Sequence, residues 1–210
     1  MKGFSVKTEI EEYDTFEQYA EKAELGPRDL VLCGEHTYEK YVAPLSLGVQ
    51  TLFREKYGKG EPTDGMVDAI LDALREKEFE RIVAIGGGTV VDIAKAVAVA
   101  GKEDKVDDLY DHVDSLKKVH PLILIPTTCG TGSEVTNISV INRVSKGVKM
   151  GLSSNAMLAD KAVMITEMLD SLPYKVFATS SIDAMVHSAE SFLSPNGCSI
   201  SRLFSAEALK

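Results

Sequence analysis

The sequence has 210 residues, with 23 basic and 32 acidic side chains, a net charge of −9 at pH 7, and 44% hydrophobic residues. These values are typical of a globular protein that can bury a core as one large domain or two small ones. The acidic balance argues against nucleic acid or an anionic membrane as the main partner, because phosphate recognition needs a basic surface. No apolar run approaches the roughly 20 residues of a membrane span, and the acidic beginning lacks the apolar stretch of a secretory signal.

The cysteines are few and scattered, at Cys33, Cys129 and Cys198. They form no CxxC pair, so the sequence predicts neither a disulfide framework nor a thiolate zinc site. A reducing cytoplasm is therefore the expected compartment.

Strand and helix patterns alternate along the first part of the chain. Short apolar segments predict buried strands at 30–33, 49–53, 82–85 and 122–125. Helical spacing of apolar residues predicts one helix that begins with Asp64 as its N-cap, and a second, largely buried helix over 90–100. Continuous apolar strands alternating with helices indicate an α/β fold, a parallel sheet with helices on both faces.

The pattern changes after Thr136. Two segments of alternating polarity, 137–144 and 148–154, flank a glycine-containing turn and predict a β-hairpin. Residues 162–165 predict one more strand. From Pro173 onward the spacing is helical, with a break at Pro195-Asn196-Gly197 and a second helix near Ser201, so we expect a domain boundary near residue 170.

A run of glycines, Gly86-Gly87-Gly88 followed by Thr89, ends the strand at 82–85 and opens the next helix. Glycines let a backbone approach a ligand closely, and a helix N-terminus offers unpaired N–H groups and positive potential. The junction therefore suits a pyrophosphate. A tight strand-to-helix turn is the alternative, but it requires fewer glycines; the order is not the GxGxxG of the usual dinucleotide fingerprint.

A second loop, PTTCGTGSE over 126–134, follows the next strand in the same way. In an open parallel sheet, ligands lie beyond the carboxyl ends of the strands, so the two loops are expected to face one crevice. A solvated Thr/Ser loop is the alternative for this loop taken alone, and the presence of both loops argues against it. Cys129 has no cationic neighbour in the sequence, so we do not expect a nucleophile there.

An acidic residue and a histidine, Asp183 and His187, are spaced i, i+4 in the predicted helix and share one of its faces. Such a pair can hold a divalent metal ion. Pairs of this kind are often structural or solvated, but the apolar residues around this one favour a functional site. The remaining histidines lie in polar segments and are predicted to be surface residues: His36, His112 and His120.

Three segments, GGGTVVDIAK, PTTCGTGSEVT and DAMVHSAES, resemble in order and spacing the hallmark segments of the iron-containing (group III) alcohol dehydrogenases. The resemblance covers essentially the whole chain. It implies a Rossmann-like NAD(P)-binding domain over 1–170 and the beginning of an all-helical metal-binding domain over 171–210. It also implies a small alcohol or aldehyde substrate and a homo-oligomer. Segments such as KYGKGEPTD and FATSSIDAMVHSAESFLSP look most like the 4-hydroxybutyrate dehydrogenase branch.

The resemblance also implies roles for individual residues. Gly87, Gly88 and Thr89 would hold the coenzyme diphosphate, and Asp92 would fix their loop from the first turn of the helix. The adenosine and ribose side would be lined by Thr127, Thr128 and Thr131. Lys149 resembles the lysine that reaches the nicotinamide ribose and is the predicted catalytic residue, with an ordinary exposed lysine as the alternative.

The implied metal ligands are Asp183 and His187, with Fe(II) as the family's ion and Zn(II) or Mn(II) compatible with the same ligand types. Two further ligand histidines of the family lie downstream of this pair, and no histidine follows His187. We therefore expect this chain to be the N-terminal part of a longer enzyme and to turn over little by itself.

One predicted coenzyme-binding position departs from the family pattern. Many members carry an acidic residue at the end of the first strand, where it binds the adenosine ribose; here the position is Gly34, with Glu35 beside it. A missing carboxylate relaxes discrimination against a 2′-phosphate, so NAD and NADP both remain open.

The predicted reaction is hydride transfer between a nicotinamide coenzyme and 4-hydroxybutyrate or succinate semialdehyde, with a metal ion as Lewis acid. One alternative is an enzyme of the same family that acts on a simple primary alcohol or a diol. The other is a non-catalytic nucleotide-binding module.

Overall fold

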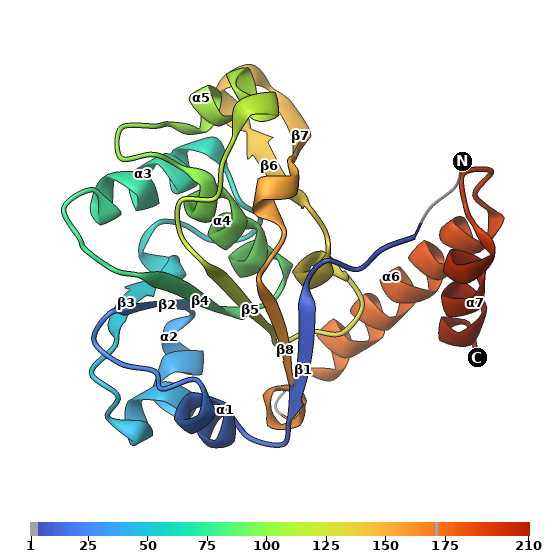
Figure 1. Ribbon diagram of the computed structural model, residues 1–210, viewed down its shortest axis with the longest axis horizontal. Coiled ribbons are helices and arrows are strands. Elements are labelled where there is room, and N and C mark those ends of the chain that lie inside the picture. The colour runs from blue at the N-terminus through green and yellow to red at the C-terminus, as the bar shows by residue number, and fades with distance from the viewer. Residues whose placement is uncertain (1–3, 171) are drawn as a thin grey trace.

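The protein, described here from a computed structural model over residues 4–170 and 172–210, is built on a six-stranded sheet in the order β1-β8-β5-β4-β2-β3 (Figure 1). Its strands are β1 (Glu9–Tyr13), β2 (Asp29–Cys33), β3 (Gln50–Phe53), β4 (Arg81–Gly86), β5 (Leu122–Pro126) and β8 (Lys161–Ile165). All neighbouring strands are parallel. The predicted parallel α/β sheet is therefore confirmed. Its apolar central strands are buried on both faces, as is typical of parallel sheets.

The edge strand β1 was not predicted from the sequence. Its sequence, EIEEY, is largely exposed, which suits an edge position. Its acidic residues give it no apolar pattern by which a strand could be predicted. It pairs in parallel with β8, where Lys161 forms an ion pair with Glu11 and lies 3.6 Å from a carboxylate oxygen of Glu9. The lysine that balances the charge of β1 is therefore distant in sequence.

Helices cover both faces of the sheet, as predicted (Figure 1). One face carries α3 (Asp64–Leu74), α4 (Gly88–Val99) and α5 (Val106–Asp111). The other carries α1 (Phe16–Lys22), α2 (Glu35–Thr37) and the helical turns over 38–45. The side chains of alternate residues in β2 and β4 fall into the two separate cores, which fixes the sheet between the helical layers.

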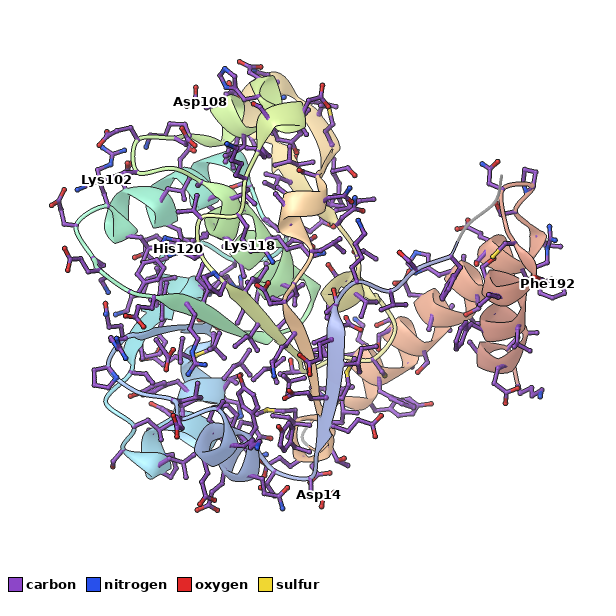
Figure 2. The ribbon with its side chains drawn as sticks, in the orientation of Figure 1. Asp14, Lys102, Asp108, Lys118, His120 and Phe192 are labelled. Carbon is purple, nitrogen blue, oxygen red and sulfur yellow. The ribbon has the colours of Figure 1, made fainter. Side chains whose placement is uncertain are left out.

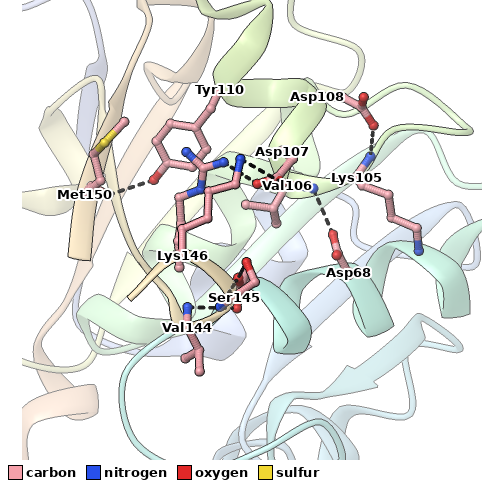
Figure 3. Close-up of polar contacts among 12 residues, drawn as sticks. Asp68, Lys105, Val106, Asp107, Asp108, Tyr110, Val144, Ser145, Lys146 and Met150 are labelled. Atoms are coloured by element: carbon pink, nitrogen blue, oxygen red, sulfur yellow. Dashed lines mark hydrogen bonds and ion pairs between the residues drawn. The ribbon is translucent and has the colours of Figure 1, made fainter. Parts of the chain in front are cut away.

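The predicted hairpin is present as β6 (Ile138–Arg143) and β7 (Val148–Ser153), which pair in antiparallel fashion apart from the main sheet. Figure 3 shows α5 held against it: the Tyr110 hydroxyl donates to the Met150 carbonyl oxygen at 2.7 Å, and Lys146 pairs with Asp107 at 3.0 Å. These contacts hold β7, the strand that contains Lys149, against α5.

The N-cap of α3 lies one residue before the predicted cap. The hydroxyl of Thr63 accepts the Met66 N–H at 3.1 Å, so Thr63 is the N-cap and the prediction of Asp64 was wrong. Asp64 instead accepts hydrogen bonds from Val144 and Ser145 in the hairpin turn. Burial raises the pKa of Asp64, but the hydrogen bonds from Ser145, Gly65 and Val144 together outweigh it and leave the pKa below its ordinary value.

Two helices, α6 (Tyr174–Leu193) and α7 (Ser199–Ala208), extend away from the sheet and pack on each other (Figure 1). Figure 2 shows Phe192 near the far end of α6, and many apolar side chains of this pair are exposed. The ring of Phe204 stacks on Phe4 with centroids 5.5 Å apart. Within residues 4–170 and 172–210, no helix has the length and apolar character needed to cross a bilayer.

Candidate functional site

The site lies where the chain reverses direction across the sheet. From β2 the chain passes outward to β3 and then returns to β4 on the other side of β2. In sheets of this kind, the carboxyl ends of the two strands at the reversal, here β2 and β4, border the ligand crevice. Gly34 follows β2, and Gly86-Gly87-Gly88 ends β4 and opens α4, so the two glycine positions predicted to bind coenzyme border this crevice.

The glycine loop and the threonine-rich loop touch each other. A Cβ atom on Gly87 would lie 3.3 Å from Cγ2 of Thr128, and one on Gly88 would lie 3.7 Å from Cγ2 of Thr131. The Thr127 N–H donates to the Gly86 carbonyl oxygen at 3.1 Å. The loops therefore form one continuous surface at the N-terminus of α4, where no side-chain cap hydrogen bond is present.

A third segment, residues 60–61, contacts both the glycine loop and β7. The hydroxyl of Thr89 donates to the Gly60 carbonyl oxygen at 3.3 Å, and Nζ of Lys149 lies 2.8 Å from Oε1 of Glu61. The structure thus brings Lys149 from β7 to the same surface as Thr89. The side chain of Lys149 is 51% exposed, so its ammonium group is accessible to a ligand.

The side chain of Asp92 is 15% exposed and is held by contacts within the protein. Its carboxylate accepts from the Ser133 hydroxyl at 2.7 Å and from the Val140 N–H at 3.2 Å. Burial raises the pKa of this carboxyl group, and the bond from Ser133 and the charge of Lys95 oppose that rise. The contacts match a residue that holds the threonine-rich loop to α4.

Lys95 was missed in the sequence, where it lies in an apolar helix. Its side chain is 0% exposed, and Nζ donates to Oγ of Ser133 at 2.8 Å, to Oγ1 of Thr136 at 3.1 Å and to the Ile138 carbonyl oxygen at 2.7 Å. Burial lowers the pKa of this amine to about 8, although Asp92 opposes the shift. The only signal in the sequence is the i, i+3 spacing of Asp92 and Lys95.

The threonine-rich loop also supports α6. Gly130 has φ of +122°, and a Cβ atom there would overlap the Ser180 carbonyl oxygen and lie 3.2 Å from Cβ of Ala184. Sγ of Cys129 lies 3.7 Å from Oγ of Ser180. Glycine at 130 therefore allows the helical turn that carries Asp183 to rest directly on the loop. A cavity of about 510 Å³ opens beside this contact, between the ends of β1, β5 and β8, and Thr128, Cys129 and Gly130 line it.

The predicted metal ligands share one face of α6. Nδ1 of His187 lies 3.8 Å from Oδ2 of Asp183, and the side chains are 55% and 48% exposed. A carboxylate oxygen and an imidazole nitrogen at this separation fit part of the coordination of a divalent transition metal. Across residues 4–170 and 172–210, no group of three or more potential ligands gathers around them. The pair therefore fits as two ligands of a larger set.

The position of Gly34 is filled by a neighbouring side chain. A Cβ atom there would lie 2.6 Å from Oε1 of Glu55, in the turn that follows β3. Glu55 was also missed, because nothing in its local sequence links it to the end of β2.

The other histidines lie away from the crevice. His36 and His112 are exposed, as predicted. The prediction was wrong for His120, which is half-buried with its ring 4.4 Å from that of Phe79, and this burial lowers its pKa. All three cysteines are free thiols.

Comparison with known proteins gives one consistent family. The family model for iron-containing alcohol dehydrogenase matches residues 9–166. The 4-hydroxybutyrate dehydrogenase of Clostridium kluyveri is 38% identical over all 210 residues, which span 56% of its length. A solved iron-containing alcohol dehydrogenase from Thermotoga maritima superposes with a TM-score of 0.82 at 28% identity, over 99% of this chain and 59% of that one.

A second solved structure supports the fold. The sulfoacetaldehyde reductase of Bifidobacterium kashiwanohense, in complex with NAD+, superposes with a TM-score of 0.85 at 24% identity, over 100% of this chain and 58% of that one. The chain therefore spans a little over half the length of the relatives to which it is similar.

Proposed function

The chain belongs to the iron-containing alcohol dehydrogenases, and we propose that it supplies the coenzyme-binding part of an NAD(P)-dependent enzyme that transfers a hydride between the nicotinamide and a small alcohol or aldehyde. The contact between Gly87 and Thr128 carries this proposal, because it joins the ends of β4 and β5 into one surface at the N-terminus of α4. In this proposal, residues 1–170 bind the coenzyme and residues 171–210 begin a helical metal-binding domain.

The positions of the loop residues support the proposed coenzyme roles. Gly87 and Gly88 expose backbone N–H groups for the diphosphate, and Thr89 adds a hydroxyl at the first turn of α4. The ribose and adenosine side falls to Thr127, Thr128 and Thr131. In this proposal Lys149 leaves Glu61 and donates to the nicotinamide ribose, since the exposed ion pair between them is weak.

Asp183 and His187 would supply two ligands to a divalent metal ion, with iron as the family expectation and zinc or manganese as further candidates. When bound, the metal supplies Lewis-acid polarisation of the substrate C–O bond, and the nicotinamide accepts or donates the hydride. The protein's own contribution is placement: Gly130 lets the turn that holds Asp183 rest on the loop that contains Thr128. The proposed coenzyme-binding residues and metal ligands are thus both positioned by the threonine-rich loop.

We propose 4-hydroxybutyrate and succinate semialdehyde as the substrate pair, supported by 38% identity over the whole chain to a 4-hydroxybutyrate dehydrogenase. A simple primary alcohol or a diol is the second candidate, and the family tendency toward homo-oligomers extends to this protein. With added Fe(II) and NAD+, we expect NADH absorbance to rise faster with 4-hydroxybutyrate than with butanol or propanediol. A faster rise with butanol or propanediol would overturn the substrate assignment.

Coenzyme binding is the direct test of the function. Titration calorimetry of the chain with NAD+ is expected to show binding that Gly87→Val abolishes, because the added side chain meets Thr128 and covers the loop. Gly26→Ala is the matched control, since a Cβ atom at Gly26 meets nothing within 4 Å. Equal binding by both variants would contradict the diphosphate assignment. Binding of NAD+ by a chain that binds no divalent metal ion at Asp183 and His187 would favour a non-catalytic nucleotide-binding module.

A further inference from the structure

We propose that Glu55 supplies the carboxylate that the end of β2 lacks, that it accepts hydrogen bonds from the adenosine ribose hydroxyls, and that it thereby selects NAD over NADP. The proposal rests on the proposed coenzyme function and adds a residue that determines coenzyme specificity. It starts from Gly34, where the absence of a side chain leaves the coenzyme choice open in the sequence.

The carboxylate of Glu55 occupies the place of a side chain on Gly34. Oε1 lies 2.6 Å from where a Cβ atom of residue 34 would stand, and Oε2 accepts the Glu35 N–H at 3.3 Å. The negative charge of Glu55 also adds to burial in raising the pKa of the Cys33 thiol, at the last residue of β2. Glu55 therefore brings its charge from the turn after β3 to the end of β2.

That location is the one from which a carboxylate recognises a ribose. In dinucleotide-binding sheets, an acidic group at the end of the strand next to the glycine loop accepts hydrogen bonds from the ribose hydroxyls. Here β2 is the strand that neighbours β4 and its glycines. A 2′-phosphate at the same place would meet a carboxylate instead of a hydrogen-bond donor, and like charges close together repel.

The basic residues of the same turn do not replace this carboxylate. Arg54 donates to the Gly58 carbonyl oxygen at 3.2 Å, and Nζ of Lys56 lies 5.1 Å from the centre of the Phe53 ring. Both cations have contacts within their own strand-turn segment. Among the charged residues of this turn, the one presented beside Gly34 is therefore Glu55.

The test is the ratio of NAD+ to NADP+ affinity, measured on the chain by saturation-transfer NMR, which reports weak binding as well as strong. Glu55→Gln keeps the shape and removes the charge, and we expect the preference for NAD+ to fall about 10-fold, the effect of one charge-assisted hydrogen bond. Glu35→Gln is the matched control, because its exposed side chain is next in sequence to Gly34 and only its backbone N–H contacts Glu55. An unchanged ratio in Glu55→Gln, or a change in Glu35→Gln alone, would overturn the assignment.

A swap of the two positions separates charge from shape. Gly34→Asp alone places a second carboxylate against Glu55, so we expect NAD+ binding to weaken. The double variant Gly34→Asp, Glu55→Ala removes the collision and returns one carboxylate to the end of β2, so the NAD+ preference is expected to recover. If the double variant still binds NAD+ but shows no renewed preference for it, the role of Glu55 is refuted while the proposed function stands. If the unmodified chain binds neither NAD+ nor NADP+, the proposed function is refuted, and this inference with it.

Discussion

Nζ of Lys95 lies 2.8 Å from Oγ of Ser133, and this hydrogen bond joins the buried face of α4 to the end of the threonine-rich loop. Asp92, one turn earlier, accepts from the same hydroxyl at 2.7 Å. Ser133 is therefore held between a buried cation and a partly buried carboxylate. The loop that faces the crevice is positioned from inside the protein rather than by its own sequence.

Replacement of Lys95 is expected to loosen that loop. Lys95→Met leaves Thr136 and the Ile138 carbonyl oxygen without their donor, so we expect the free energy of unfolding to fall by about 2 kcal/mol. Amide hydrogen exchange over 127–138 should become faster. Lys102→Met is the control, because its ammonium group is exposed and lies 3.9 Å from Glu76. Equal stability of the two variants would contradict the positioning role.

The same lysine predicts a dependence of stability on pH. Burial lowers the pKa of folded Lys95 to about 8, whereas the ordinary lysine value is 10.5. Between these values the unfolded chain binds more protons than the folded one, so the contribution of Lys95 to stability rises with pH across this window. Urea unfolding can be measured for the original chain and for Lys95→Met at pH values of about 7.5, 8.5 and 9.5. The difference between their free energies of unfolding should grow with pH. A difference that falls or stays level would refute the lowered pKa.

The contact between the threonine-rich loop and α6 depends on a glycine. Gly130→Ala puts a methyl group against the Ser180 carbonyl oxygen, and rotation of a side chain cannot relieve a collision with backbone. We expect α6 to separate from the loop, so that Cys129 reacts several-fold faster with iodoacetamide, read by mass spectrometry. Gly132→Ala is matched in its positive φ but meets nothing within 4 Å, so it should leave Cys129 unchanged. Similar reactivity in both variants would argue against the contact.

Much of the fold follows from local patterns. The central strands are short, apolar and buried, and the hairpin alternates around Gly147, so the sequence predicts both. The strand β1 escapes prediction because its glutamates are balanced by Lys161, whose position beside them depends on the complete topology. The cap of α3 was misplaced by one residue because Thr63 and Asp64 are both residue types that cap helices.

The site divides in the same way. Gly87 and Thr128 belong to motifs that can be recognised in the sequence, and their contact follows once parallel strands bring both loops to one edge. Lys95 and Glu55 could not be found, because their roles depend on partners contributed by other strands and loops. The motifs therefore predict where ligands meet the protein, and the structure adds what holds those motifs in place.

Loss of Asp183 is expected to remove metal binding without disturbing the coenzyme surface. The carboxylate and the imidazole of His187 share one face of α6, so the chain should bind Mn(II) weakly through this pair and broaden their NMR signals. Asp183→Asn retains the shape but removes the charged ligand, so the broadening should disappear while NAD+ binding persists. His112→Gln is the control, because Nδ1 of that exposed histidine lies 3.0 Å from the Asp108 carbonyl oxygen, within its own segment of the chain. Broadening that survives in Asp183→Asn, or that disappears in His112→Gln, would place the metal elsewhere.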